Sequence, residues 1–272
     1  MKSVKDMVQE QRDEVARYRH LAEKVTREKL ALLPSVLGVL LTGSVARGDA
    51  RKGQFGLQID ITVVVTNRSA FNLDDVFGPS LEPYIPYHCV EIEGQPFAFE
   101  LSTMEQLQGI RTSYEPVIFA KREAAVLFDR SGQLSRWKAE AFVLTEKQIC
   151  RRALQQYFRF DYLTNDYRIE KWNHREAWVQ MIQNGNEALE CYCNFLYCIN
   201  GWFIPRRDWL TYLTSELADK ASGHEEMMKD LYKAEPTEQE VGRRASGLRK
   251  LGSWMRQYCE SKGWLSRPSL SR

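Results

Sequence analysis

The sequence predicts an α+β fold, in which a mixed, mostly antiparallel sheet with flanking helices precedes an all-α helical bundle. Apolar runs at residues 36–42 and 58–66 are typical of strands. Two further apolar stretches flank the polar segment 93–95, which is the pattern of a β-hairpin. From about Thr145 onward strand signals vanish and helix-forming residues dominate, so we expect the second half to be helical.

The N-terminal half is expected to alternate helices with strands. Apolar residues at helical spacing among many charges indicate a long first helix, which Pro34 ends. Glycines and clusters of polar residues separate the elements that follow. In chain order we expect a helix over 3–33, a strand over 36–42, a short helix over 44–50, a strand over 58–66, an irregular stretch over 67–85, strands over 86–93 and 96–102, a helix near 104–111 and a strand over 124–128.

The C-terminal half is expected to form a bundle that is rich in aromatic side chains. The predicted helices lie near 146–170, 174–200, 206–221, 223–233 and 237–262. These assignments divide the chain into a first domain over 1–144, a helical domain over 145–264 and a flexible tail over 265–272.

Composition narrows the class of protein. The 272 residues are 43% hydrophobic and 27% charged with a formal net charge of +2, which is an ordinary soluble profile without a strong nucleic-acid signal. No stretch is apolar enough to span a bilayer, so no membrane partner is expected. The six cysteines lack the spacing of a zinc site, which favours buried reduced thiols and a cytoplasmic location.

The turn between the first two predicted strands is rich in chemical information. Gly43 and Ser44 close this turn, and the next strand carries Gln58, Asp60 and Thr62 at alternate positions, which share one face. Backbone N–H groups and a hydroxyl suit phosphate oxygens, and a carboxylate suits magnesium. The pattern therefore favours a site for a nucleoside triphosphate with Mg²⁺.

This segment resembles the Gly-Ser-x-Ala-Arg-Gly … Asp-x-Asp signature of the nucleotidyltransferase superfamily of the DNA polymerase β type. Within it, the chain is most similar to aminoglycoside-nucleotidyltransferase-like enzymes with a helical C-terminal domain. The matching positions of the first half are Gly43, Ser44, Ala46, Arg47 and Gly48, and those of the second half are Ile59, Asp60 and Ile61. Gln58 stands where the family has its first metal-binding aspartate.

The resemblance implies a role for each residue. Gly43 and Ser44 would cradle the triphosphate, and Asp60 would bind the metal with Gln58 as its second ligand. In this family two or three carboxylates hold two magnesium ions, one of which activates the acceptor hydroxyl. Glu100 resembles the third acidic position, which is often the general base for that hydroxyl.

The amide at Gln58 leaves several alternatives open. An amide oxygen can coordinate magnesium but carries no charge, so two neighbouring ions would be poorly compensated. A second register makes Asp60 the first carboxylate and Thr62 its partner, and one carboxylate of the pair is missing in either register. The site then binds a single metal, or another acid such as Asp49 or Asp74 substitutes, or catalysis is lost.

The resemblance implies a magnesium-dependent transfer of a nucleoside monophosphate, AMP from ATP, to a hydroxyl of a small-molecule acceptor, which by analogy is antibiotic-like. Arg47 would either reach the phosphates or form a structural ion pair. Two other functions remain open. One is a catalytically degenerate nucleotide-binding or interaction protein on the same fold, and the other is an antitoxin-type nucleotidyltransferase that acts on a protein hydroxyl.

Overall fold

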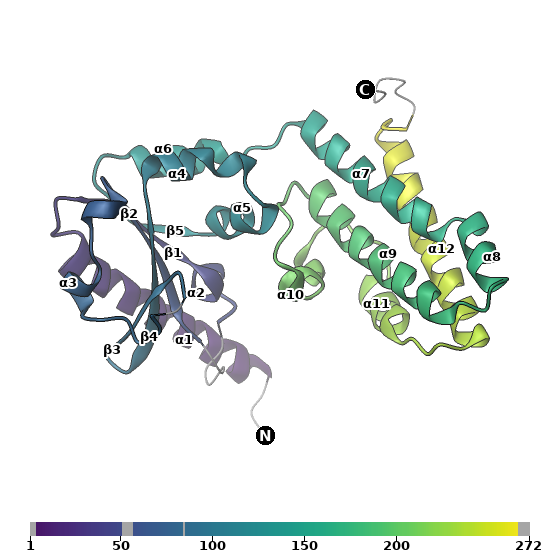
Figure 1. Cartoon of the computed structure of the whole chain (residues 1–272), viewed down its shortest axis with the longest axis horizontal. Coiled ribbons are helices and arrows are strands. Elements are labelled where there is room, and N and C mark those ends of the chain that lie inside the picture. The colour runs from purple at the N-terminus through teal and green to yellow at the C-terminus, as the bar shows by residue number, and fades with distance from the viewer. Residues whose placement is uncertain (1–3, 51–56, 84, 266–272) are drawn as a thin grey trace. The chain divides into compact units, whose positions relative to one another are not determined.

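The structure is a computed structural model that describes residues 4–50, 57–83 and 85–265. The chain divides into two compact units, Met1–Val143 and Leu144–Arg272 (Figure 1). The first unit contains a sheet with helices and the second is helical, which confirms the predicted α+β class. Apart from its first residue, the predicted tail over 265–272 lies outside the described residues.

The sheet of the first unit has five strands in the order β3-β4-β2-β1-β5. The strands are β1 (Val36–Thr42), β2 (Ile59–Val65), β3 (His88–Ile92), β4 (Gln95–Ser102) and β5 (Ala125–Asp129). Only the β2–β4 pair is parallel, and the other three pairs in the described sheet are antiparallel. The sheet is therefore mixed and mostly antiparallel, as predicted.

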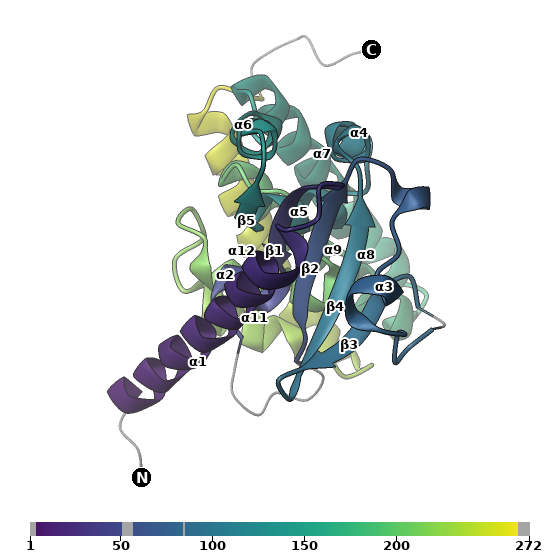
Figure 2. The same cartoon turned by 90° about the vertical axis from the view of Figure 1, so that its left-hand side faces the viewer.

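Helices cover both faces of this sheet (Figures 1 and 2). They are α1 (Val4–Val25) with a π-helical turn (Thr26–Leu30), α2 (Gly43–Arg47), α3 (Asp74–Phe77), α4 (Met104–Gln108), α5 (Glu115–Arg122) and α6 (Gln133–Ala141). The predictions included neither α5 nor α6. Helix α5 begins with a proline in its first turn, a position that suits proline because no intrahelical N–H bond is lost there.

The alternation of side chains along β2 divides the two faces between different cores. Ile59, Ile61 and Val63 pack against α1 in one apolar cluster. Val64 joins a second cluster with residues of α4 and α6 on the other face. Asp60 shares that second face, because side chains two apart on a strand point the same way. A polar patch thus continues the face that α4 and α6 cover.

The helical unit consists of α7 (Glu146–Thr164), α8 (Asp166–Asn173), α9 (Trp178–Ile199), α10 (Arg207–Leu210), α11 (His224–Tyr232) and α12 (Glu238–Ser261). The helix predicted over 146–170 is two helices, because the Asn165 side chain accepts a hydrogen bond from the Arg168 amide and starts a new one. The prediction of a single helix over 206–221 is also wrong. This segment is α10 followed by a 3-10 turn (Tyr212–Glu216), in which the Thr214 hydroxyl bonds the Thr211 carbonyl.

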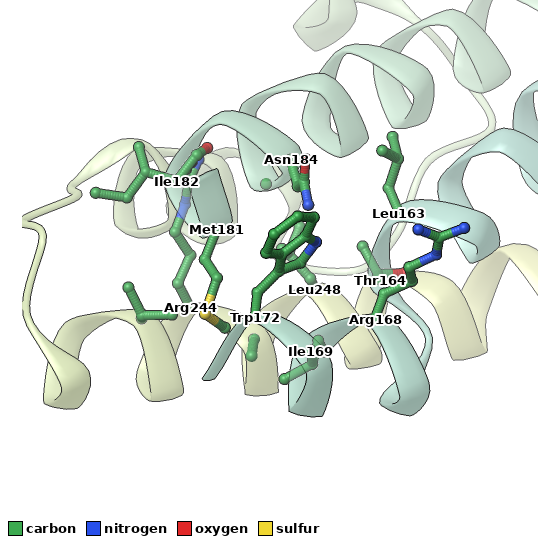
Figure 3. A pocket seen from close by; sticks show the side chains of 13 residues that line it. Leu163, Thr164, Arg168, Ile169, Trp172, Met181, Ile182, Asn184, Arg244 and Leu248 are labelled. Atoms are coloured by element: carbon green, nitrogen blue, oxygen red, sulfur yellow. Dashed lines mark hydrogen bonds between the residues drawn. The ribbon is translucent and has the colours of Figure 1, made fainter. Parts of the chain in front are cut away.

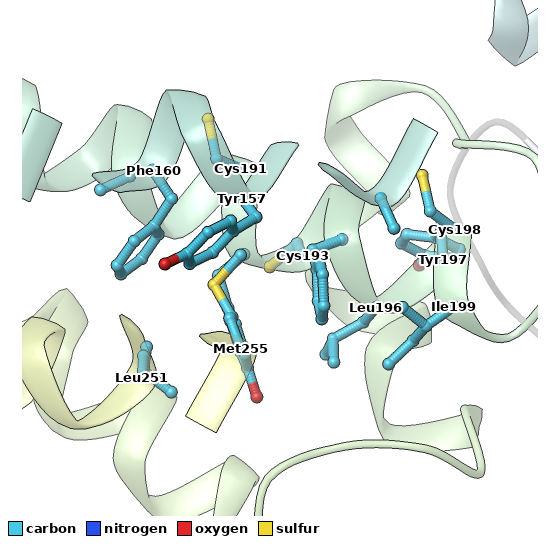
Figure 4. Close-up of a cluster of buried hydrophobic side chains, with 14 of the residues drawn as sticks. Tyr157, Phe160, Cys191, Cys193, Leu196, Tyr197, Cys198, Ile199, Leu251 and Met255 are labelled. Atoms are coloured by element: carbon cyan, nitrogen blue, oxygen red, sulfur yellow. The ribbon is translucent and has the colours of Figure 1, made fainter. Parts of the chain in front are cut away.

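Helix α9 lies at the centre of the helical core (Figure 4). Its large aromatic side chains Tyr192, Phe195 and Tyr197 are fully buried. All six cysteines of the chain are free and buried, which confirms the prediction of reduced thiols. Burial raises the pKa of the Cys191 and Cys193 thiols to about 12, so both stay protonated and unreactive at neutral pH.

Within residues 4–50, 57–83 and 85–265, no helix combines the length and the apolar character that crossing a membrane requires.

Candidate functional site

Gly43 and Asp60 meet at the end of the β1–β2 ladder. Thr42, the last residue of β1, pairs with Asp60, and Gly43 follows with φ of +69°. A Cβ on Gly43 would stand 2.0 Å from Oδ2 of Asp60, so any other residue here would force the carboxylate to move. The two residues lie on separate segments of the sequence, and in the fold the Asp60 carboxylate contacts the turn at Gly43.

The turn after β1 is held in place by α1. Arg19 of α1 donates hydrogen bonds to the carbonyl oxygens of Val45 at 3.1 Å and of Ala46 at 2.5 Å. These bonds satisfy carbonyls at the end of α2, where a helix leaves them without internal partners. Gly48 ends the helix in the left-handed conformation, with φ of +90°. The half-buried Ser44 therefore lies in a short turn that Arg19 holds through two hydrogen bonds.

Glu100 reaches the same face of the sheet from β4. It pairs with Thr62 across the parallel β2–β4 ladder, so its side chain lies diagonally from Asp60. The Thr62 hydroxyl donates to Oε2 of Glu100 at 3.0 Å. The fully buried Phe97 and Phe99 of the same strand belong to the opposite cluster with α1, as the alternation in the sequence predicts.

Lys121 of α5 is the site residue that sequence reasoning missed. Its ammonium donates to Oγ1 of Thr62 at 2.6 Å and to Oε2 of Glu100, with which it forms an ion pair. Lys121 is only 6% exposed, whereas 41% of the Glu100 side chain is exposed. Lys121 lies three residues after the buried Ile118 and therefore on the buried side of α5, but the sequence analysis did not predict this helix.

The other acidic candidates are committed elsewhere. Oδ2 of Asp49 accepts bonds from the Arg47 guanidinium at 3.2 and 3.3 Å, so Arg47 is engaged in a local ion pair. Asp74 lies 3.3 Å from Nδ1 of His88. His88 pairs with Phe99 and so shares the face opposite Glu100. Asp49 and Asp74 therefore each have a basic partner of their own.

The described residues offer few hard oxygen ligands for a divalent cation. Gln58 is half-buried immediately before β2 and contributes no charge. Among the described residues no three His, Cys, Asp or Glu side chains come together as metal ligands. The tight fit of the Asp60 carboxylate beside Gly43 leaves one hard oxygen ligand next to the turn. Asp60 is the residue that could hold a magnesium ion, because Mg²⁺ binds through one or two carboxylates and completes its shell with phosphate and water.

The helical unit contains a small cavity of its own (Figure 3). Its lining is mostly apolar and includes Trp172, Met181 and Leu248, together with Arg244. Burial lowers the pKa of Arg244, whose guanidinium bonds the carbonyls of Leu231 and Ile182 and the side chain of Asn186. The cavity volume is about 30 Å³, which is enough for a water molecule beside the guanidinium.

Comparison with solved structures gives distant likenesses, one of which is described below. No protein-family model and no curated protein matches the sequence. The crystal structure of a nucleotidyltransferase-like protein from Exiguobacterium sibiricum is similar, with 13% sequence identity and a TM-score of 0.47. The match covers 90% of this chain and 78% of the other.

Proposed function

We propose that this protein binds a magnesium–nucleoside triphosphate beside the Gly43–Ser44 turn and transfers the nucleoside monophosphate to a hydroxyl of a small acceptor. The observation that carries the proposal is the missing Cβ of Gly43, whose place lies 2.0 Å from Oδ2 of Asp60. A backbone turn suited to phosphate oxygens and a carboxylate suited to a cation thus meet at a single point. The signature of residues 43–48 and 59–61 supports the same chemistry.

The chain's own residues would bind and orient the reactants. The Ser44 hydroxyl and the adjacent backbone would hold phosphate oxygens, while Asp60 would hold the cation. Bound Mg²⁺ would neutralise charge on the triphosphate. The acceptor oxygen then attacks the α-phosphorus, the bond from that phosphorus to the oxygen bridging the β-phosphorus breaks, and pyrophosphate leaves. Glu100 would accept the hydroxyl proton on Oε1, since Lys121 and Thr62 both bond Oε2.

A second candidate function is nucleotide binding without transfer. Two observations favour it: the amide of Gln58 supplies no charge, and the Glu100 carboxylate is already paired with Lys121. The two candidates share the binding step and differ only in the release of pyrophosphate. ATP as the nucleotide and an antibiotic-like compound as the acceptor follow from the family resemblance and belong to the proposal.

Calorimetric titration of ATP with and without Mg²⁺ tests the binding step. We expect magnesium to tighten ATP binding at least about tenfold, because Asp60 would hold the cation that accompanies the triphosphate. Asp60→Asn keeps the size of the side chain but removes its charge, and should abolish that gain. The exposed Asp75 of α3 provides a matched control, and Asp75→Asn should bind as the parent does.

Pyrophosphate release with a panel of polyhydroxyl acceptors then separates the two candidates. Release by the parent, and its loss in Glu100→Gln, would support transfer. Binding without release, together with release only after Gln58→Asp, would support the degenerate alternative. Failure of both the parent and Gln58→Asp to bind any nucleoside triphosphate would refute both candidates.

A further inference from the structure

Lys121 is a buried cation that bonds a carboxylate and a hydroxyl of the sheet. An ammonium has three N–H donors, and two acceptors of the Lys121 ammonium are the Thr62 hydroxyl and Oε2 of Glu100. Burying a charge is costly unless it is paired, so this lysine is stable there because of the carboxylate. The half-exposed Glu100 opens to solvent on the sheet face that carries Asp60.

The sheet unit offers a second lysine for comparison. Lys138 of α6 is also substantially buried, but its ammonium bonds the backbone carbonyl of Arg122. That contact ties α6 to the end of α5 and involves no carboxylate of the sheet. Lys121, in contrast, binds Glu100, a carboxylate on the same sheet face as Asp60. The contrast indicates a role for Lys121 in the charge balance of the site.

The charges of the polar face support this role. Asp60 and Glu100 are acidic, and the Lys121 ammonium offsets the charge of Glu100 through their ion pair. Same-face residues on a strand are about 7 Å apart, which places the Lys121 cation, held at Thr62, close to the Asp60 end of the patch. A fixed ammonium there can stabilise phosphoryl charge as a metal ion does.

We propose that the Lys121 ammonium replaces one of the two divalent cations that such a site would otherwise hold, so that the protein takes a single divalent ion with its nucleotide. This inference rests on the proposed function. It also accounts for the amide at position 58, because a site that holds one metal ion needs fewer carboxylates. Glu100 then serves as the counter-ion of a built-in cation.

Counting bound Mn²⁺ by equilibrium dialysis tests this replacement. The full chain is saturated with α,β-methylene-ATP, which cannot transfer its nucleotide. We expect one Mn²⁺ per parent protein and two per Lys121→Met, because the substitution frees Oε2 of Glu100 and Oγ1 of Thr62. Lys138→Met should hold one ion, as the parent does. The double variant Glu100→Gln/Lys121→Met should return to one ion, since the freed carboxylate is gone.

The same comparison without nucleotide uses Mn²⁺ alone as the probe. Lys121→Met should bind it at least about tenfold more tightly than the parent, because divalent affinity rises with the negative charge of the ligands. Two ions in the parent, or no extra ion in a folded Lys121→Met, would overturn the proposal. If circular dichroism shows that Lys121→Met does not fold, Lys121→Gln takes its place, because glutamine is neutral but can still form hydrogen bonds. A count of two Mn²⁺ ions in the parent would overturn the proposal even without a folded variant.

The outcomes separate the two proposals. A parent that binds no nucleotide refutes the proposed function, while the Mn²⁺-only comparison still decides the role of Lys121. A parent that binds nucleotide with two ions refutes the role of Lys121 and leaves the proposed function standing.

Discussion

Each unit of this protein has a glycine whose missing Cβ makes room for a charged side chain. In the sheet unit Gly43 faces Asp60, and in the helical unit Gly185 of α9 faces Arg244, with a Cβ position 3.0 Å from Nη1. The surroundings differ. Asp60 is half-exposed beside a turn, whereas Arg244 is 2% exposed and bonded to backbone carbonyls and an amide. The same packing device supports a candidate site in one unit and joins helices in the other.

The largest expected effect on stability comes from removing the Arg244 side chain, which joins helices of the helical unit through its hydrogen bonds. Arg244→Met would remove the buried hydrogen bonds to the carbonyls of Leu231 and Ile182 and to the side chain of Asn186, and the loss of a buried partner costs about 1–3 kcal/mol. We therefore expect the free energy of unfolding in urea to fall by about 3 kcal/mol. Arg249 on the same helix forms an exposed ion pair with Asp166, so Arg249→Met should cost less than about 1 kcal/mol. Equal losses in the two variants would contradict the structural role of Arg244.

In the sheet unit, substitution of Gly43 should lower both the stability of the protein and its affinity for Mg–ATP. Gly43→Ala introduces both a left-handed alanine and a contact with Asp60, and we expect a loss of about 2 kcal/mol in stability together with loss of Mg–ATP binding. Gly48 has φ of +90° and nothing within 4 Å of its Cβ position, so Gly48→Ala carries the backbone strain alone. Thermal unfolding and calorimetry should show the smaller loss and retained binding in Gly48→Ala. If Gly43→Ala and Gly48→Ala lost equal amounts of stability and Mg–ATP affinity, the close contact between Gly43 and Asp60 would not be needed for binding.

A smaller effect is expected from acidification of the helical unit. Burial lowers the pKa of His224, whose ring contacts the hydroxyls of Tyr192 at 3.1 Å and Thr214 at 2.9 Å. Because the folded state disfavours protonation, the stabilisation is present above the unfolded pKa of about 6.5 and is lost as pH falls through the folded pKa. Unfolding free energies from pH 7.5 to 5 should therefore decline less steeply in His224→Gln.

The exposed His174 gives the control for that pH profile. His174→Gln should keep the slope of the parent. If His224→Gln keeps it as well, burial of His224 does not govern the acid response.

Strands were easier to predict from the sequence than the shorter helices. The strands β1 and β2 and the β3–β4 hairpin lie within a few residues of their predicted ranges, because alternation along a strand is a local pattern. The short helices α5 and α6 were missed, since eight or nine residues contain few repeats of the helical period.

The residues of the candidate site also differ in how well the sequence predicts them. Gly43, Ser44 and Asp60 follow from a local motif, and the face of Glu100 follows from alternation along β4. Lys121 could not be predicted, because its position depends on how the unpredicted α5 packs on the sheet. The partners of Arg47 and Asp49 likewise depend on the conformation of the turn after α2.

A double-mutant cycle between Ser44→Ala and Asp60→Asn, measured as Mg–ATP affinity, tests the central claim most directly. Residues that hold the same bound complex show interaction energies of about 0.5–3 kcal/mol, whereas independent sites add within about 0.5 kcal/mol. We predict a coupling of about 1 kcal/mol, because the turn and the carboxylate would hold one magnesium–triphosphate complex between them. Losses that simply add would show that the two residues do not act on a common ligand.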